Sequence, residues 1–203
     1  MRSKSIRRVV GSGISCVVAC LLGIFMMAPP VAAQSGAAAE LAAFQARVDA
    51  YVAMHRRIEG PLPPMEATKD LDEARQLKEV LRNRIRVERG SRGTLITPGL
   101  VDAFKQVIGS TLTLADVVNI SEEVEEHTPP RMAKIRVNAP LPDAAPFVTI
   151  PPTLLRALPQ LPPELRYVAL SGALIIWDQH ADLVVDIMPR LFDPLMYSKK
   201  TGL

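Results

Sequence analysis

The sequence predicts an α+β protein with a helical N-terminal half and a small antiparallel sheet near its C-terminus. Between residues 40 and 126, apolar side chains recur every three or four positions, which is the period of helices with one buried face. After Thr128-Pro129-Pro130 the pattern changes to short apolar runs, some alternating and some continuous, as is typical of strands. The last three runs are separated by short polar breaks, which favours an antiparallel meander.

The first predicted helix extends from Glu40 to Glu59. Gly60 is its predicted C-cap, and the prolines that follow prevent it from continuing. A second helix is expected from about Thr68 to Arg89, with Thr68 or Asp70 as its N-cap. Because a short proline-rich link joins them, we expect an antiparallel helical hairpin. The buried stripe of its first helix is expected to contain Leu41, Phe44, Val48, Tyr51, His55 and Ile58.

Two more helices are expected before residue 128. Thr97 is an N-cap candidate, and Pro98 fits the first helical position, where its missing N–H is not needed. Gly109 is expected to interrupt this third helix. A fourth helix is expected from about Thr113 to Glu126.

Strands and turns are expected in the remainder. Apolar and charged residues alternate from Arg131 to Val137, which predicts a half-exposed strand. A second short strand is expected from Phe147 to Ile150. Pro151-Pro152 is expected to open one or two helical turns. The meander follows, with a tight turn at Ser171-Gly172. Its three strands are expected at about 165–170, 173–177 and 183–188.

The first 33 residues have the features of a secretory signal peptide. A basic start precedes the uncharged apolar run Val9–Met27, and the small residues Val31-Ala32-Ala33 mark a cut after Ala33. A retained membrane anchor, a twin-arginine signal at Arg7-Arg8 and a lipoprotein cut at Cys20 are the alternatives. We therefore expect an exported protein, in the periplasm or outside the cell. Its expected parts are a signal peptide (1–33), a helical region (34–127), a small β-sheet module (128–190) and a tail (191–203).

Export changes the charge and cysteine content of the chain. The whole chain has 24 Lys and Arg against 21 Asp and Glu, and four of the basic residues lie in the predicted signal. The exported part then has 20 basic and 21 acidic residues, so the pI of about 9.0 does not indicate a nucleic-acid partner. Both cysteines lie in the signal, so we expect no disulfide and no thiolate metal site. No membrane contact is expected after cleavage.

The stretch "IIWDQHADLVVD", residues 175–186, admits two interpretations. Asp178, His180 and Asp182 stand at every second position, so on one strand their side chains would share a face and form a ligand set for a divalent metal. The competing interpretation is a turn between the last two strands, and the turn chemistry favours it. Asp178 would then accept backbone N–H groups, Asp182 would occupy or follow a left-handed position, and His180 would lie at the exposed tip.

Other acid and histidine side chains give weaker indications. Asp186 is expected to face solvent or to pair with Arg166 or Lys134. A triad of Ser171, His180 and Asp186 lacks any supporting motif. His55 is expected at the edge of its helix stripe in a structural role, because a histidine without a nearby acid is poor evidence for catalysis.

Several segments resemble those of uncharacterised exported bacterial proteins. They are "MHRRIEGPLPP", "AKIRVNAPLP", "IPPTLLRALPQLPPELRYV" and "LIIWDQHADLVVDIMP". The C-terminal part is also similar to small periplasmic modules of unknown function and to the tail of nickel/cobalt homeostasis proteins. In the shared pattern Asp178 falls at the start of the turn, which implies a structural role.

Two functions follow as expectations. The first is a non-enzymatic envelope protein without a cofactor, which contacts a protein partner or a second copy through the helical hairpin. The alternative is a divalent-metal-binding or hydrolytic periplasmic protein that uses the loop of residues 178–182.

Overall fold

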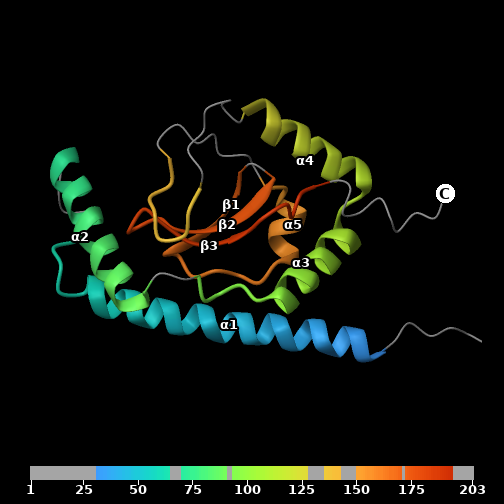
Figure 1. The fold of residues 1–203 in the computed structure, drawn as a ribbon, viewed down its shortest axis with the longest axis horizontal. Helices are drawn as coiled ribbons and strands as arrows, with labels where there is room; N and C mark the ends of the chain where they lie inside the picture. The colour runs from blue at the N-terminus through green and yellow to red at the C-terminus, as the bar shows by residue number, and fades with distance from the viewer. Residues whose placement is uncertain are drawn as a thin grey trace, which may run out of the picture. The chain divides into compact units, whose positions relative to one another are not determined.

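The computed structural model describes residues 31–64, 70–90, 93–127, 135–142, 150–170 and 172–193. The α+β prediction is confirmed, because helices precede a three-stranded antiparallel sheet (Figure 1). Apart from the first residue of α1, all elements belong to one compact unit, Ala32–Leu203. The elements are α1 (Val31–Glu59), α2 (Leu71–Arg89), α3 (Pro98–Thr111), α4 (Leu114–His127), α5 (Pro152–Ala157), β1 (Leu165–Leu170), β2 (Ala173–Asp178) and β3 (Leu183–Met188).

The sheet is a meander in the order β1-β2-β3, as the sequence predicts. Between β2 and β3 the register shifts, because Ile176 pairs with Asp186 but its neighbour Trp177 pairs with Val184. Val185 is therefore an extra residue in β3, and the two strands form a β-bulge there. Beyond the bulge, every side chain of β3 changes to the face opposite to the one expected from simple alternation.

One face of the sheet packs against helices. A single hydrophobic cluster joins residues of α1, α2, α3 and α5 to strand residues such as Leu174 and Ile176. α1 runs along one side of the sheet. α2 lies near one end of the sheet, and α3 and α5 lie near the opposite end (Figure 1). The helical region and the sheet therefore share one core. The first residues of the expected tail join it, because Leu191 and Phe192 are fully buried.

The opposite face of the sheet is covered by residues 135–142. Leu141 packs there against Val168, Leu170, Ile175 and Val184. Two backbone hydrogen bonds fix the segment to β3, from Asn138 N to Val184 O at 2.8 Å and from Val184 N to Ala139 O at 2.9 Å. Of the expected strand 131–137, residues 131–134 lie outside the described residues. Residues 135–137 form no strand and lead into a turn. Of the expected strand 147–150, only Ile150 is described, and it precedes α5 without strand structure.

α1 buries five of the six residues of the stripe that its spacing predicts, and Leu41 is only half-buried. Phe44, Val48, Tyr51, His55 and Ile58 are all buried. Gly60 ends the helix as expected, since its N–H donates to Arg56 O at 2.9 Å.

α2 begins after Asp70, whose side chain accepts a hydrogen bond from Asp72 N at 2.8 Å. Thr68, the other expected cap, lies outside the described residues. The helix buries Leu81 and Ile85. α1 and α2 meet near their C-terminal ends, where Arg57 forms an ion pair with Glu88 at 2.8 Å. This contact corrects the expected antiparallel hairpin, in which the C-terminal end of α1 would lie beside the start of α2. Instead the C-terminal ends of the two helices meet, and the rest of α2 leads away from α1 (Figure 1).

α3 confirms its predicted cap and corrects its predicted end. Thr97 Oγ1 accepts a hydrogen bond from Leu100 N at 3.1 Å. Gly109 does not interrupt the helix, which continues to Thr111; a single glycine only weakens a helix whose buried face packs well. In the described part of the chain, no helix combines the length and the apolar character needed to cross a membrane.

Candidate functional site

The turn between β2 and β3 begins at Asp178, whose side chain is completely buried. Its Oδ1 accepts hydrogen bonds from His180 N at 3.1 Å and from Ala181 N at 2.9 Å. Asp182 adopts the left-handed backbone conformation, with φ of 47°. Both backbone features of the turn interpretation are therefore confirmed. The expected exposure of the tip is only partial, because His180 is half-buried.

The other oxygen of Asp178 faces α1. Tyr51 and His55 lie one helical turn apart on the buried face of α1. The Tyr51 hydroxyl donates to Asp178 Oδ2 at 2.7 Å, and His55 Nδ1 lies 2.6 Å from the same oxygen. Asp178 thus accepts four hydrogen bonds, which compensate the cost of burying its negative charge.

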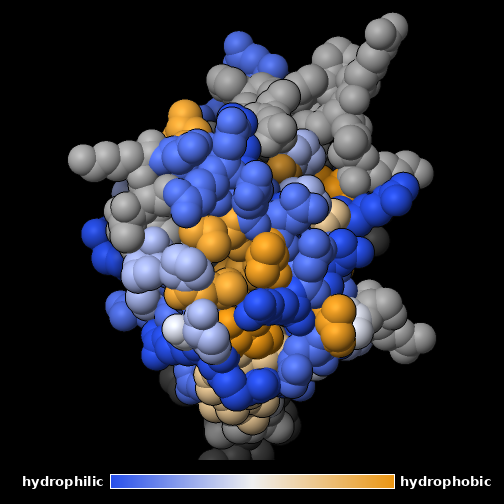
Figure 2. Space-filling view, turned by 90° about the vertical axis from the view of Figure 1, so that its left-hand side faces the viewer, coloured by the Kyte–Doolittle hydropathy of each residue, from blue (hydrophilic) through white to orange (hydrophobic). Residues whose placement is uncertain are grey.

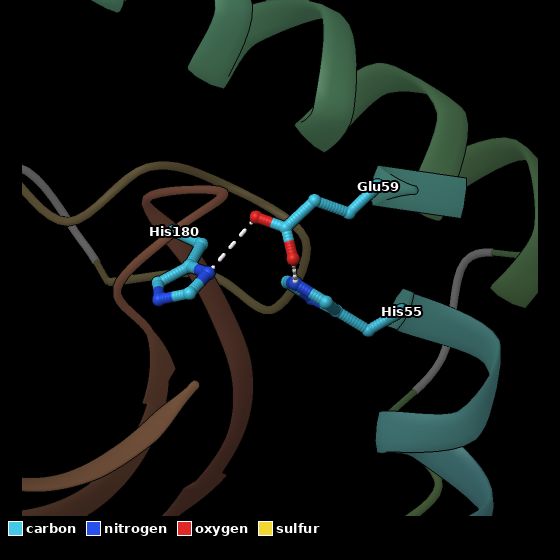
Figure 3. A group of neighbouring side chains, drawn as sticks. All are labelled: His55, Glu59 and His180. Carbon is cyan, nitrogen blue, oxygen red and sulfur yellow. Dashed lines mark hydrogen bonds and ion pairs between the residues drawn. The ribbon is translucent and has the colours of Figure 1, made fainter. Parts of the chain in front are cut away.

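Beyond His55, two further polar side chains complete a cluster (Figure 3). Glu59, the last residue of α1, places Oε2 3.0 Å from His55 Nε2. Its Oε1 lies 2.9 Å from Nδ1 of His180, which comes from the turn. One ligand atom from each of His55, Glu59 and His180 lies within 4.8 Å of the other two. We call these three residues the two-histidine cluster.

The hydrogen bonds define the state of the His55 ring. Nδ1 faces the buried carboxylate of Asp178 and must hold a hydrogen, so in neutral imidazole the lone pair is on Nε2. That lone pair would face the carboxylate of Glu59 at 3.0 Å, and two acceptors do not attract each other. A cation relieves the conflict, either a proton on Nε2 or a metal ion shared by Nε2 and Glu59.

The pKa of His55 reflects this surrounding. Burial lowers the pKa, but the hydrogen bond and charge of Asp178 and those of Glu59 outweigh it, so the pKa is raised above the ordinary value. Asp178 and Glu59 thus both favour the imidazolium form of His55. The cluster is therefore a place where positive charge is stabilised.

The cluster has the donor set of a transition-metal site. Two imidazole nitrogens and a carboxylate oxygen are ligands that zinc, cobalt, nickel and iron(II) accept. Asp178 binds the other nitrogen of His55, as carboxylates commonly do for metal-ligating histidines, and so fixes the ring orientation. His55 is fully buried, while the side chains of Glu59 and His180 are 28% and 33% exposed. An ion can therefore reach the cluster from solvent.

The sequence-predicted ligand set is divided by the structure. His180 lies in the two-histidine cluster, and Asp178 lies behind it as the partner of His55. Asp182 turns towards α2, where its Oδ2 forms an ion pair with Arg82 at 3.0 Å. Its Oδ1 accepts hydrogen bonds from Trp177 Nε1 at 3.2 Å and from Leu141 N at 3.3 Å.

Two expectations about single residues are wrong. His55 is not a histidine without a nearby acid, because Asp178 and Glu59 both contact its ring. Lys134, one of the two expected partners of Asp186, lies outside the described residues, and Asp186 neither faces solvent nor forms an ion pair with Arg166. It is buried, and its Oδ2 accepts hydrogen bonds from Leu95 N at 2.9 Å and Ile96 N at 3.0 Å. The bulge at Val185 turns Asp186 to the helix side of the sheet.

Glu59 was not among the residues singled out from the sequence, and His55 was expected to have only a structural role. The spacing of four between His55 and Glu59 on a predicted helix was a signal, because it places both on one face. Nothing local connects them with His180, which follows 121 residues after Glu59. The triad of Ser171, His180 and Asp186 gains no support, since His180 Nδ1 contacts Glu59 and Ser171 lies outside the described residues.

Comparisons with known proteins assign no family. No family model, no curated protein and no solved structure matches the chain. The resemblance to exported bacterial proteins therefore stays a prediction. Any function must be argued from the geometry of the described residues.

Proposed function

We propose that this protein binds a divalent transition-metal ion through the two-histidine cluster. The ligands are Nε2 of His55, the carboxylate of Glu59 and Nδ1 of His180. One observation supports this most: Asp178 engages Nδ1 of His55, so Nε2 of the same ring faces the Glu59 carboxylate at 3.0 Å, where the two groups can share a cation. A metal ion satisfies both groups at once.

The donor set favours certain ions. Imidazole nitrogen suits zinc, cobalt, nickel and copper, whereas magnesium and calcium prefer oxygen ligands. Three protein ligands leave at least one coordination position for water or an external ligand. That open position is compatible with metal transport, metal storage or metal-assisted hydrolysis.

Export is part of the proposal. It is supported by the basic residues at positions 2–8 and the uncharged run Val9–Met27. In the periplasm, a protein without cysteine ligands would bind metal through histidine and carboxylate, and its site would not depend on the redox state of thiols.

Calorimetry and thermal unfolding of chelator-treated protein test the proposal. We expect one zinc, nickel or cobalt ion per chain, and no comparable binding of magnesium. Bound metal should raise the unfolding temperature, because an ion at 100 times its Kd adds about 2.7 kcal/mol to the free energy of unfolding.

Substitution of single histidines gives the matched control. His180→Ala should weaken binding by at least about ten-fold, because a ligand is lost. His127→Ala removes the third histidine of the chain, the last residue of α4. Equal metal affinity of both variants would contradict the proposal.

A protein-interaction role is a second candidate, favoured by the surface of α2. Val80 and Val87 are 38% and 86% exposed. Val87 lines a groove of about 480 Å³ together with Ile58 and Pro61 of the α1 end. Figure 2 shows that hydrophobic side chains gather on this side of the molecule and are surrounded by hydrophilic ones. Such a patch is a candidate contact with a second copy of the chain.

The test of this second candidate is the mass in solution. We expect the wild-type protein to self-associate as its concentration rises, and Val87→Ser to weaken that association while the chain stays folded, since Val87 is mostly exposed. A wild-type protein that sediments as a monomer at all concentrations would remove the candidate.

A further inference from the structure

A second groove lies on the other side of Val87, between α2 and the segment that covers the sheet. Its volume is about 710 Å³. Arg86 and Val87 line it from α2, and Arg136, Val137 and Asn138 line it from the segment. Among its described lining residues none is acidic. We call it the basic groove.

The two lining arginines lack the ion pairs that two nearby arginines form. Arg82 is paired with Asp182, and Arg57 is paired with Glu88. Arg86 and Arg136 are exposed and form no ion pair with any residue that the structure describes. Their guanidinium groups come from two separate elements, so the basic groove holds two positive charges that no carboxylate of the described residues neutralises.

The floor of the basic groove is built from fixed polar groups. Arg89 Nη1 donates to Asn138 Oδ1 at 2.7 Å, and Arg89 Nη2 donates to Val185 O at 2.9 Å. Asn138 Nδ2 donates in turn to Gly90 O at 2.8 Å. Asn138 has a φ of 64°, a left-handed conformation that asparagine tolerates, and these bonds hold it there. The segment that supplies Arg136 is therefore anchored to α2.

Arg89 adds a third positive charge beneath this floor. It forms no ion pair with a carboxylate among the described residues, since its two hydrogen bonds go to an amide and a carbonyl oxygen. Burial lowers the pKa of Arg89, and the negative charges of Asp186 and Asp178 only partly oppose this effect. A half-buried guanidinium without a bonded carboxylate raises the electrostatic potential of the wall above it.

We propose that the basic groove binds a phosphate group that carries an apolar substituent. Guanidinium groups match the oxygens of a phosphate and form charge-assisted hydrogen bonds with them. Val87 and Val137 line the groove beside the arginines and provide contact area for the apolar part of the ligand. A soluble phosphate ester and the headgroup of an anionic phospholipid share this chemistry. The inference does not depend on the metal site.

Two binding experiments distinguish these sources. Phenyl phosphate, titrated by calorimetry into the full protein at low salt, represents the soluble ester. Sedimentation with phosphatidylcholine vesicles, with and without phosphatidylglycerol, represents the membrane surface. We expect saturable binding in at least one experiment, weakened by salt because charges carry it.

Substitutions locate the binding. Arg86→Gln and Arg136→Gln should each weaken it by about ten-fold, since each removes a charge-assisted hydrogen bond. Arg84→Gln is the matched control, because Arg84 lies on the same helix but lines the neighbouring groove. Its affinity should stay within about two-fold of the wild type.

Three outcomes would overturn the inference. The first is the absence of saturable binding in both experiments. The second is an equal loss in Arg84→Gln and Arg86→Gln, which would indicate general attraction by positive charge. The third is unchanged binding in Arg136→Gln, which would mean that the segment of residues 135–142 does not contribute to phosphate binding.

Discussion

The two aspartates that flank the β2–β3 turn have similar local roles and different surroundings. Asp178 is fully buried and accepts hydrogen bonds from the turn and from the side chains of Tyr51 and His55. Asp182 is half-buried and accepts them from Arg82, Trp177 and the backbone of residue 141. Both aspartates anchor the turn to a helix, Asp178 to α1 and Asp182 to α2.

The two aspartates differ in whether the side chains that donate hydrogen bonds to them have another atom that can bind a metal ion. Of the side chains that contact Asp178, His55 has a second nitrogen that can bind a cation. The guanidinium and indole groups that contact Asp182 have no lone pair to offer a metal. The same residue type in the same turn therefore orients a candidate metal ligand on one side and supports only the fold on the other.

Asp178→Asn should have the largest effect. The amide presents a donor where Asp178 now only accepts, so buried hydrogen bonds are lost and His55 loses its orientation. We expect the free energy of unfolding to fall by about 3–5 kcal/mol, as for other broken buried charge pairs. Metal affinity should fall by about 10–100-fold. Urea unfolding and calorimetry measure the two effects.

Asp182→Asn is the matched control for that change. Its carboxylate is partly exposed, so the loss of stability should be about 1 kcal/mol or less, and metal affinity should be unchanged. If both variants lost the same stability and the same affinity, the two sides of the turn would not differ as described.

Tyr51→Phe removes one of the four hydrogen bonds to Asp178 and leaves the packing of the ring. A hydrogen bond to a charged group contributes about 1.5–3 kcal/mol, so the unfolding free energy should fall by an amount near the lower value. Metal affinity should fall less than in Asp178→Asn, because His55 keeps its carboxylate partner. Unchanged stability would show that Tyr51 does not help to hold the Asp178 charge.

Much of this architecture follows from local pattern. The stripe of α1, the caps Thr97 and Asp70, the meander and the turn at Asp178 each depend on residues close together in the sequence. Helix periodicity and turn chemistry report such features, because the physical cause is local.

The site itself could not be predicted, because its causes are distant in the sequence. Asp178 meets His55 across 123 residues, and the sequence pattern contains nothing that pairs them. Asp186 was misplaced because a single bulge residue reverses the alternation of β3. Its partners, the N–H groups of residues 95 and 96, lie in a segment between two helices that no periodicity describes.

Glu59→Gln should separate metal binding from stability. The Glu59 side chain is 28% exposed at the end of α1, so its loss should change the free energy of unfolding by no more than about 1 kcal/mol. Metal binding should fall by at least about ten-fold, because the only carboxylate ligand of the two-histidine cluster is removed. Unchanged metal affinity, measured by calorimetry, would exclude Glu59 as a ligand.

Arg82→Met should have the smallest effect and tests the other side of the turn. The Arg82 guanidinium contacts both the carboxylate and the backbone oxygen of Asp182, at 3.0 Å each, and methionine keeps much of the aliphatic volume. The pair is partly exposed, so we expect a loss of about 1 kcal/mol or less in urea unfolding. Metal affinity should remain that of the wild type, because Asp178 and α1 hold the ligands without help from α2. A clear loss of metal affinity would mean that the contact with α2 also positions His180, and the turn would then act as one unit.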